Sequence, residues 1–379
     1  MGPTGGDRAV SKPLRVLVAP DKFKGTLDAA GVAAAIAVGV RRAHPDAVIT
    51  EHPIADGGEG TVELALTYGF TPVTVPVRGP LGQPVAARFA LRDTTAVVEM
   101  AAGAGLGLLP DGPTRRSARD ASSYGVGELL LAATRAGADR IVLGLGGSAS
   151  TDGGAGAIQA LGGRLDGAHA DFIGGGALID VEGLDLTGLD ETVRAARVWL
   201  GCDVEAPLTG PGGAAAVFAP QKGADRDEVA ALDAGLRHWA DVVARATGRD
   251  LRRVPGAGAA GGLAFGLASV LGAPIGSGVD ALLDLSGFDA RLAQADLVIV
   301  GEGSLDAQSL LGKGPIGVAR RAGRAGVSSI AVVGRSLVTA EQARAAGLRA
   351  VVSVAARLGE SRSRTDTAAA IAEAVAQAL

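Results

Sequence analysis

The sequence predicts an α/β fold with two α/β domains: a discontinuous Rossmann-like parallel-sheet domain, and a second mixed α/β domain inserted into it. Apolar strand-like runs alternate with helical stretches at both ends of the 379-residue chain, which is typical of parallel sheets with helical crossovers. The middle of the chain has short strand-like runs joined by proline and glycine, which favours antiparallel pairing. We therefore predict an outer domain of residues 1–62 and 287–379 and an inserted domain of residues 63–286.

The outer domain is predicted from an alternation of strands and helices that occurs at both ends of the chain. At the N-terminus, LRVLVAP (14–20) predicts a strand, residues 27–43 a helix and residues 47–55 a second strand. The C-terminal part predicts, in order, a strand at 295–301, a helix near 307–325, a strand at 328–334, a helix near 339–346, a strand at 348–355 and a helix from about Thr365. Both ends of the chain are therefore expected to contribute to one sheet.

The inserted domain has a different pattern of predicted strands and helices. Three short strands, with antiparallel pairing, are predicted within residues 71–100. They are followed, in order, by a helix at about 122–136, a strand at 139–145, a glycine loop with a further helix, a strand at 196–202 and a long helix near 225–246. The ligand site of such an architecture is expected in a cleft where the chain crosses between its domains.

Composition excludes several classes of function. The net charge of −4 and an aromatic content of 3% argue against nucleic acid as a partner. Cys202 is the only cysteine, so an internal disulfide or a thiolate metal cluster is excluded, and an inert buried thiol is expected. The N-terminus has no apolar signal core and no apolar run approaches roughly 20 residues, so the sequence predicts a cytoplasmic protein without a membrane partner.

Lysine is rare in this chain and clusters near glycine. There are five lysines among the 36 basic residues, and Lys22 and Lys24 fall together in APDKFKG (19–25). Lys222 lies in APQKGA and Lys313 in LGKGP. Because a lysine ammonium is a compact charge on a flexible stem, it suits a transferred anionic group better than the fork of arginine. These four lysines are candidates for contact with phosphate or carboxylate.

Six loops combine glycine with charged or hydroxyl side chains, and nearly all follow a predicted strand and precede a predicted helix. They are APDKFKG (19–25), PIADGGEGT (53–61), GLGGSASTDGGAG (144–156), GCDVEAPL with APQKGA (201–224), GAGAAGG (256–262) and GEGSLDAQSLLGKGP (301–315). In an open α/β sheet this position is the carboxyl edge of the strands, where ligands bind and helix N-termini offer N–H groups to anions.

Two of the glycine loops have competing interpretations. Ser148 and its neighbours would either surround a phosphate or carboxylate, or cap the following helix. GAGAAGG matches GxGxxG, but the LRRVP before it is a weak strand, so tight helix packing is favoured over dinucleotide binding. The pattern GxxxxGK[ST] is absent from the sequence, so use of ATP would not involve a P-loop.

Carboxylates also recur at predicted strand ends; they are Asp56, Glu59, Asp203, Glu302 and Asp306. Any one of them alone is better explained as a cap or a surface ion pair. Their recurrence beside lysines favours Mg²⁺ coordination and activation of a hydroxyl group, because Mg²⁺ takes oxygen ligands. The four histidines have no ligand spacing, which argues against zinc. Lysines, carboxylates and glycine loops together predict phosphoryl transfer.

The six loops, in this order, resemble those of the bacterial type I glycerate kinases, and the similarity runs from LRVLVAPDKFKG through GEGSLDAQSLLGKGPIGVA to the C-terminus. The resemblance implies ATP-dependent phosphorylation of D-glycerate with Mg²⁺, usually to 2-phosphoglycerate, on two α/β domains. This chain departs from the family pattern at Thr151 and Ala206, where the family usually has asparagine.

Residue roles are predicted from strand-end placement and side-chain chemistry. The predicted catalytic residues are Asp203 as general base, Lys22, Lys24, Asp21 and Asp306. The predicted nucleotide-binding residues are Gly146, Gly147, Ser148, Lys222 and Lys313, and the predicted Mg²⁺ ligands are Asp56, Glu59 and Glu302. Three alternatives remain: the regiochemistry of a glycerate 3-kinase, the activity of an NAD(P)-dependent oxidoreductase, or the role of a non-catalytic sensor of small acids. The sequence leaves the oligomeric state open, a homo-oligomer included.

Overall fold

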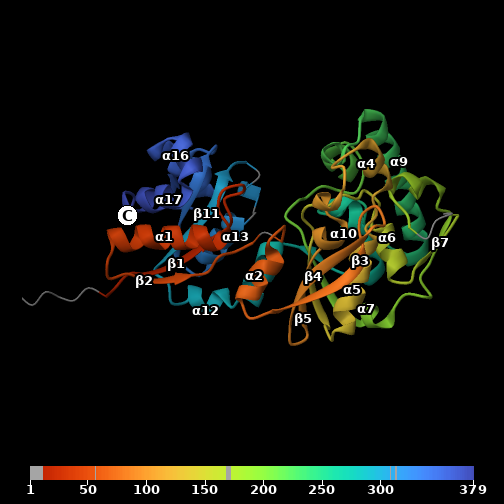
Figure 1. Ribbon diagram of the computed structural model, residues 1–379, viewed down its shortest axis with the longest axis horizontal. Coiled ribbons are helices and arrows are strands. Elements are labelled where there is room, and N and C mark those ends of the chain that lie inside the picture. The colour runs from red at the N-terminus through yellow and green to blue at the C-terminus, as the bar shows by residue number, and fades with distance from the viewer. Residues whose placement is uncertain (1–11, 56, 168–171, 308, 312–313) are drawn as a thin grey trace, which may run out of the picture. The chain divides into compact units, whose positions relative to one another are not determined.

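The computed structural model describes residues 12–55, 57–167, 172–307, 309–311 and 314–379. Contacts divide the chain into two compact units (Figure 1): unit 1 comprises Met1–Ile54 and Leu283–Leu379, and unit 2 comprises Ala55–Leu282. Unit 1 holds a parallel sheet and unit 2 a mixed one, which confirms the predicted fold class. In the part of the chain that the structure describes, no helix has the length and apolar character needed to cross a membrane.

The sheet of unit 1 has five parallel strands in the order β13-β12-β11-β1-β2. The strands are β1 (Arg15–Pro20), β2 (Val48–Glu51), β11 (Leu297–Leu305), β12 (Ser328–Ser336) and β13 (Ala350–Ser353). After Arg15, strand β1 is apolar because it lies inside the sheet, between β11 and β2, whereas the edge strand β2 is mostly exposed. The first strand of the chain therefore pairs with one that begins at Leu297.

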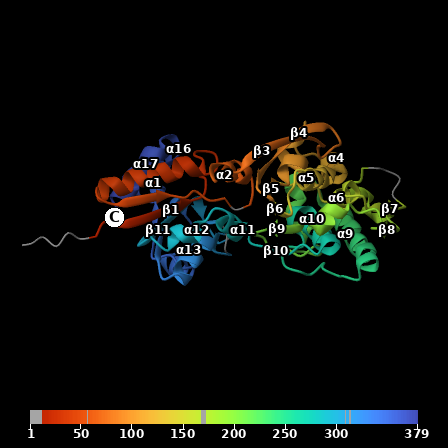
Figure 2. The same ribbon diagram turned by 90° about the horizontal axis from the view of Figure 1, so that it is seen from below.

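Helices cover both faces of this sheet. They are α1 (Ala29–Ala43), α12 (Phe288–Leu292), α13 (Gly314–Arg324), α14 (Ala340–Ala345), α15 (Val354–Leu358), α16 (Glu360–Thr365) and α17 (Thr367–Ala376), with the 3₁₀ turn η4 (Ser309–Leu311). Figure 2 shows α1 and α17 on one face and α12 and α13 on the other. Helices α1 and α17 approach closely because Gly39 has no side chain; a Cβ there would lie 2.6 Å from Cβ of Val375.

A buried histidine joins the two chain segments of unit 1. Nη1 of Arg291 donates to Nδ1 of His52 at 2.5 Å, so Nε2 carries the ring hydrogen and donates to Oγ of Ser286 at 2.8 Å. The Ser286 hydroxyl in turn donates to the carbonyl of Leu283 at 3.1 Å. Burial lowers the pKa of His52 to about 3, and the positive charge of Arg291 acts in the same direction. We call His52, Ser286 and Arg291 the His52 node.

The sheet of unit 2 has six strands in the order β10-β9-β6-β5-β4-β3. They are β3 (Thr71–Arg78), β4 (Pro84–Arg92), β5 (Thr95–Glu99), β6 (Arg140–Gly144), β9 (Arg197–Gly201) and β10 (Ile275–Gly276). Strands β3, β4 and β5 pair in antiparallel fashion, as predicted, and β5, β6, β9 and β10 are parallel. Pro72 and Pro76 are tolerated because β3 is an edge strand.

The rest of unit 2 is mainly helical. Its helices and turns are α2 (Thr61–Thr67), α3 (Ala101–Ala104), η1 (Leu106–Leu108), α4 (Arg115–Asp120), α5 (Tyr124–Arg135), α6 (Ala155–Ala160), η2 (Gly175–Asp180), α7 (Glu191–Ala195), α8 (Ala214–Phe218), η3 (Pro220–Lys222), α9 (Arg226–Thr247) and α10 (Ala259–Leu271). A small hairpin pairs β7 (Arg164–Asp166) with β8 (Gly183–Asp185), and α11 (Gly278–Leu285) leads back into unit 1. The buried core includes Trp239 and Phe265.

Two predicted strands are shorter than expected. Strand β2 ends at Glu51, not at residue 55, and β13 ends at Ser353, not at residue 355. At the second position Oγ of Ser353 accepts a hydrogen bond from the backbone N–H of Ala356, so it caps α15. Hydrophobic periodicity alone does not show where, within one apolar run, a strand ends and a capped helix begins.

Candidate functional site

The loop that follows β6 in unit 2 is packed backbone against backbone. A Cβ added at Gly144 would lie 2.1 Å from the carbonyl oxygen of Gly57, and one at Gly146 would lie 2.6 Å from Cα of Gly58. Glycine is therefore required at both positions for this approach. Gly57 and Gly58 thus lie against Gly144 and Gly146, which are far from them in sequence, at the carboxyl end of β6. We call residues 144–154 the serine loop.

The serine loop is also held from its other side. The N–H of Leu106 donates to the carbonyl of Gly147 at 2.9 Å, and the N–H of Ala149 donates to the carbonyl of Ala104 at 2.8 Å. These bonds connect the loop to α3 and η1, which follow the neighbouring strand β5. The backbone around Gly146, Gly147 and Ser148 is therefore fixed by main-chain contacts.

Lys222 is buried against this loop, with 1% of its surface exposed. Its Nζ donates to Oγ of Ser148 at 2.7 Å and to the carbonyl of Ser150 at 2.5 Å. Burial lowers the pKa of Lys222 to about 7, and the nearby carboxylate of Asp152 acts against that shift. The structure thus brings together Ser148 and Lys222, two residues predicted to bind nucleotide.

Asp152 is a fully buried carboxylate at the end of the serine loop. Oδ2 accepts hydrogen bonds from the N–H and hydroxyl of Ser123, at 2.8 and 2.7 Å, and from the N–H of Gly156 at 3.1 Å. Oδ1 accepts from the N–H of Gly154 at 3.2 Å. Burial raises the pKa of Asp152, while these hydrogen bonds act in the opposite direction. Asp152 therefore ties the loop to the starts of α5 and α6.

The motif GAGAAGG serves close packing in this structure. A Cβ at Gly258 would lie 2.3 Å from the carbonyl oxygen of Pro207, and one at Gly261 would lie 2.0 Å from that of Ser150. Gly261 also has a φ of +67°. The segment before the motif is not a strand. These contacts support the helix-packing interpretation over a dinucleotide-binding turn.

The end of β9 lies beside the serine loop in the sheet, because Gly201 pairs with Gly144. Cys202 follows, and its thiol donates to the carbonyl of Val204 at 3.1 Å. Burial raises the pKa of Cys202 to about 11, as expected of an inert thiol. The next residue, Asp203, is half-buried at this same carboxyl edge.

In unit 1, APDKFKG and GEGSLD lie together at the carboxyl ends of the paired strands β1 and β11. The N–H of Asp21 donates to the carbonyl of Gly301 at 2.8 Å. A Cβ at Gly303 would lie 3.4 Å from the backbone nitrogen of Lys24. Lys22 is half-buried and Lys24 is exposed. The two loops are therefore in contact at this edge of the sheet.

Ser309 organises the carboxylates of this edge. Its hydroxyl donates to Oε2 of Glu302 at 3.0 Å, and its N–H donates to Oδ1 of Asp306 at 3.0 Å. Sequence reasoning did not single out Arg335, whose Nε donates to Oγ of Ser304 at 3.1 Å. The signal was available, since Arg335 follows a glycine near the end of an apolar strand, as the predicted residues do.

The structure does not gather all predicted residues. Asp56 and Lys313 lie outside the described residues. Glu59 is exposed in unit 2, whereas Glu302 belongs to unit 1. Within the described ranges, no group of three His, Cys, Asp or Glu side chains is arranged to hold a metal ion. Mg²⁺ commonly binds through one or two carboxylates together with substrate phosphates and water, so paired carboxylates such as Glu302 and Asp306 still fit it.

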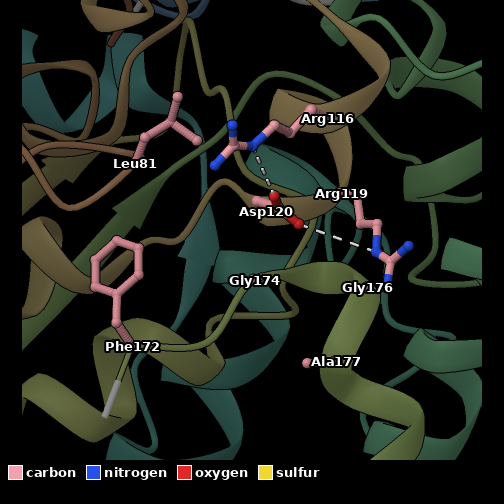
Figure 3. Close-up of a pocket in the computed structure, with 8 residues that line it drawn as sticks. All are labelled: Leu81, Arg116, Arg119, Asp120, Phe172, Gly174, Gly176 and Ala177. Carbon is pink, nitrogen blue, oxygen red and sulfur yellow. Dashed lines mark hydrogen bonds and ion pairs between the residues drawn. The ribbon is translucent and has the colours of Figure 1, made fainter. Parts of the chain in front are cut away.

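A cavity of about 270 Å³ lies elsewhere in unit 2 (Figure 3). Its lining residues are Leu81, Arg116, Arg119, Asp120, Phe172, Gly174, Gly176 and Ala177. Both arginines are directed toward Asp120, with Nε–Oδ distances of 3.4 and 3.9 Å. None of the predicted site residues belongs to this lining.

Comparison with known proteins gives a consistent result. The model of the glycerate kinase family matches residues 16–379. A glycerate kinase of Bacillus subtilis is 45% identical over 327 residues, 85% of each chain, and a glycerate 2-kinase of Escherichia coli is 41% identical over 91% of this chain and 92% of its own. The crystal structure of a Salmonella typhimurium LT2 protein assigned as glycerate kinase 2 superposes with a TM-score of 0.82, at 38% identity and 97% coverage of both chains. This chain therefore belongs to the glycerate kinase family, and it is a phosphotransferase.

Proposed function

We propose that this protein transfers the γ-phosphoryl group of ATP to D-glycerate and releases 2-phosphoglycerate and ADP. The observation that carries the proposal is the convergence of predicted residues at the carboxyl edges of two parallel strand arrays: Asp21, Glu302 and Asp306 in unit 1, and the serine loop beside Asp203 in unit 2. The Escherichia coli relative is named a glycerate 2-kinase, which supports transfer to the 2-hydroxyl.

In the proposed reaction, the substrate hydroxyl oxygen forms a bond to the γ-phosphorus while the bond to the ADP oxygen breaks. Asp203 takes the hydroxyl proton as general base. Lys22 or Lys24 contacts the transferred phosphoryl group or the glycerate carboxylate, and Asp21 and Asp306 orient these groups.

The nucleotide is proposed to lie along Gly146, Gly147 and Ser148, where backbone N–H groups and a hydroxyl suit phosphate oxygens. The ammonium of Lys313 is proposed to contact the nucleotide phosphates directly, and Lys222 is proposed to support nucleotide binding through its hydrogen bond to Ser148. Asp56, Glu59 and Glu302 are the proposed Mg²⁺ ligands. When bound, Mg²⁺ would neutralise charge on the β- and γ-phosphate oxygens.

A coupled assay tests the reaction. The protein is incubated with D-glycerate, ATP and Mg²⁺, and ADP release is followed with pyruvate kinase and lactate dehydrogenase. In a second reaction the product is passed to enolase without a mutase, so that only 2-phosphoglycerate is consumed. Absence of ADP from folded protein refutes the proposal, and ADP release without enolase turnover assigns the 3-kinase regiochemistry instead.

The general base is tested with Asp203→Asn. We expect kcat to fall by about two orders of magnitude or more, because the substrate hydroxyl then loses its proton acceptor. Asp111→Asn, which neutralises an exposed carboxylate in the same unit, is the matched control and is expected to retain normal turnover. Near-normal kcat in Asp203→Asn would remove Asp203 from this role.

The alternative functions are tested in parallel. NAD(P)⁺ reduction with D-glycerate would indicate an oxidoreductase, although the glycines at 256–262 are occupied by backbone packing. Calorimetric binding of D-glycerate without any turnover would indicate a sensor. The cytoplasmic location stays a prediction from the sequence.

A further inference from the structure

A lysine whose charge is taken out of water needs acceptors for its three N–H groups. Lys222 obtains two, Oγ of Ser148 and the carbonyl of Ser150, from a loop more than 70 residues away in sequence. Its own backbone is fixed, because Gly223 follows at φ +101° and a Cβ there would lie 2.5 Å from the carbonyl carbon of Thr114. The side chain is therefore held in one place against the serine loop.

The loop backbone has other supports. Gly147 and Ala149 are hydrogen-bonded to Leu106 and Ala104, and Asp152 is bound by four donors. Removal of the Lys222 ammonium would leave all these bonds in place. The specific effect of Lys222 is therefore on the side chain of Ser148.

In its protonated form Lys222 can only donate, so Oγ of Ser148 accepts from the ammonium and keeps its own hydrogen for another acceptor. Within the described residues, the Ser148 hydroxyl donates to the Ser150 carbonyl at 3.5 Å, and that carbonyl already accepts from Lys222 at 2.5 Å. A bond of 3.5 Å is weak. The Ser148 hydroxyl is thus polarised by a neighbouring charge and has no strong acceptor among these groups.

Two neighbouring hydroxyl groups have no hydrogen-bond partner in the part of the chain that the structure describes. Oγ of Ser150 and Oγ1 of Thr151 are buried without a hydrogen bond from or to the described residues. Ser150, Thr151 and Asp152 are fully buried, whereas Ser148 is 7% exposed. Ser148 is therefore the member of this cluster that a ligand can reach.

We propose that Lys222 is a positioning residue that makes the Ser148 hydroxyl a directed hydrogen-bond donor to an anionic oxygen of a substrate. This inference rests on the proposed kinase function. The ammonium acts through Ser148 and does not itself touch the ligand. The anionic oxygen belongs either to a nucleotide phosphate or to the glycerate carboxylate, which share the same acceptor chemistry.

The test is a double-mutant cycle with Lys222→Met, Ser148→Ala and the double variant. Kinetic constants for ATP and D-glycerate are measured with Mg²⁺, together with the melting temperature of each protein. Lys12→Met, which removes an exposed lysine, is the matched control and is expected to behave as wild type. Each single variant is expected to lower kcat/KM about 10- to 100-fold, and the double variant is expected to be no worse than Ser148→Ala.

The substrate whose KM rises identifies the source of the anionic oxygen, ATP or D-glycerate. Three results overturn the proposal: multiplicative losses in the double variant, which would mean that Lys222 contacts the ligand itself; wild-type kinetics in Lys222→Met; or a lowered melting temperature with unchanged kcat and KM per folded enzyme.

Failure of the kinase function is recognised separately, since the wild-type protein would then release no ADP. In that case the same four proteins are titrated with Mg·ATP and with D-glycerate by calorimetry. Equal losses of affinity in Lys222→Met, Ser148→Ala and the double variant support the proposal. Additive losses, or no binding by the wild type, overturn it.

Discussion

The candidate residues of unit 1 and unit 2 are held in different ways. In unit 2, glycine backbones touch one another, and the ionisable groups of Lys222 and Asp152 are buried and hydrogen-bonded. In unit 1, the side chains of Lys22, Lys24 and Asp306 are half-buried or exposed on loops after β1 and β11. One region depends on steric fit, and the other presents charge to solvent.

This difference predicts which property each substitution changes. A side chain added in the packed loops of unit 2 has to displace backbone, so it costs folding free energy. A charge removed from the loops of unit 1 disturbs little packing, so it should change kinetics and leave stability nearly unchanged. The following predictions test that distinction, in order of decreasing effect.

Gly261→Ala should have the largest effect. Its Cβ would lie 2.0 Å from the carbonyl oxygen of Ser150, and the backbone has a φ of +67°. We expect a loss of about 4 kcal/mol or more in the free energy of unfolding, measured by urea denaturation.

Gly69→Ala is the matched control for Gly261→Ala. Gly69 has a φ of +83°, but no atom lies within 4 Å of the added Cβ. We expect a loss of only about 1–2 kcal/mol, the cost of the left-handed backbone alone. Equal losses in the two variants would show that the backbone packing in unit 2 is not what makes glycine necessary.

Glu302→Gln should lower kcat/KM by about 100-fold or more with little change in melting temperature. The carboxylate is half-buried and accepts a hydrogen bond from Ser309, and the amide that replaces it is a weaker ligand for Mg²⁺. Glu341→Gln, an exposed acid at the start of α14, is the control for charge. A loss of stability large enough to account for the loss of kcat/KM would show that Glu302 has a structural role instead.

The His52 node predicts a pH dependence of the stability of unit 1. The pKa of His52 is about 3 in the folded protein against 6.5 for an unperturbed histidine, so between these values the unfolded state binds more protons. Stability therefore falls as the pH drops from 6.5 toward 3, by at most about 1.4 kcal/mol per pH unit. Urea denaturation as a function of pH measures this slope, which His52→Asn should reduce and His44→Asn should leave in place.

The two lysines of APDKFKG should give the smallest effects, and unequal ones. Lys22 is half-buried and Lys24 exposed, so the charge of Lys22 is less screened by water. We expect about a 10-fold loss in kcat/KM for Lys22→Met and a loss of a few-fold for Lys24→Met, the latter decreasing with added salt. A larger loss in Lys24→Met would reverse the assignment.

Some of this architecture follows directly from the sequence. The run LRVLVAP predicts a buried strand because every residue after Arg15 is apolar. In a parallel sheet, its carboxyl end must lie at the same edge as the carboxyl ends of the neighbouring strands. The parallel pairing of β1 with β11 agrees with the expectation that both ends of the chain contribute to one sheet. The antiparallel strands within residues 71–100 were also predictable, because prolines and short spacing indicate edge strands.

Other features depend on tertiary packing and leave no local signal. Lys222 lies between glutamine and glycine, a polar setting that suggests an exposed side chain. In the structure it is buried, because Gly223 packs against Thr114 and the ammonium of Lys222 bonds to the serine loop. Similarly, GAGAAGG has the spacing of a ligand-binding turn, but its glycines meet other backbone segments of the same unit. Local sequence shows that glycine is needed, not what approaches it.

The His52 node bears on how the chain is connected. The chain leaves unit 1 after Ile54 and re-enters it at Leu283, and the node links His52, just before the exit, to Ser286 and the Leu283 carbonyl, at the return. The points at which the chain leaves and re-enters unit 1 are thus held together by contacts within unit 1. Because its two ends are held together, this site accommodates a long insertion without disturbing the sheet of unit 1.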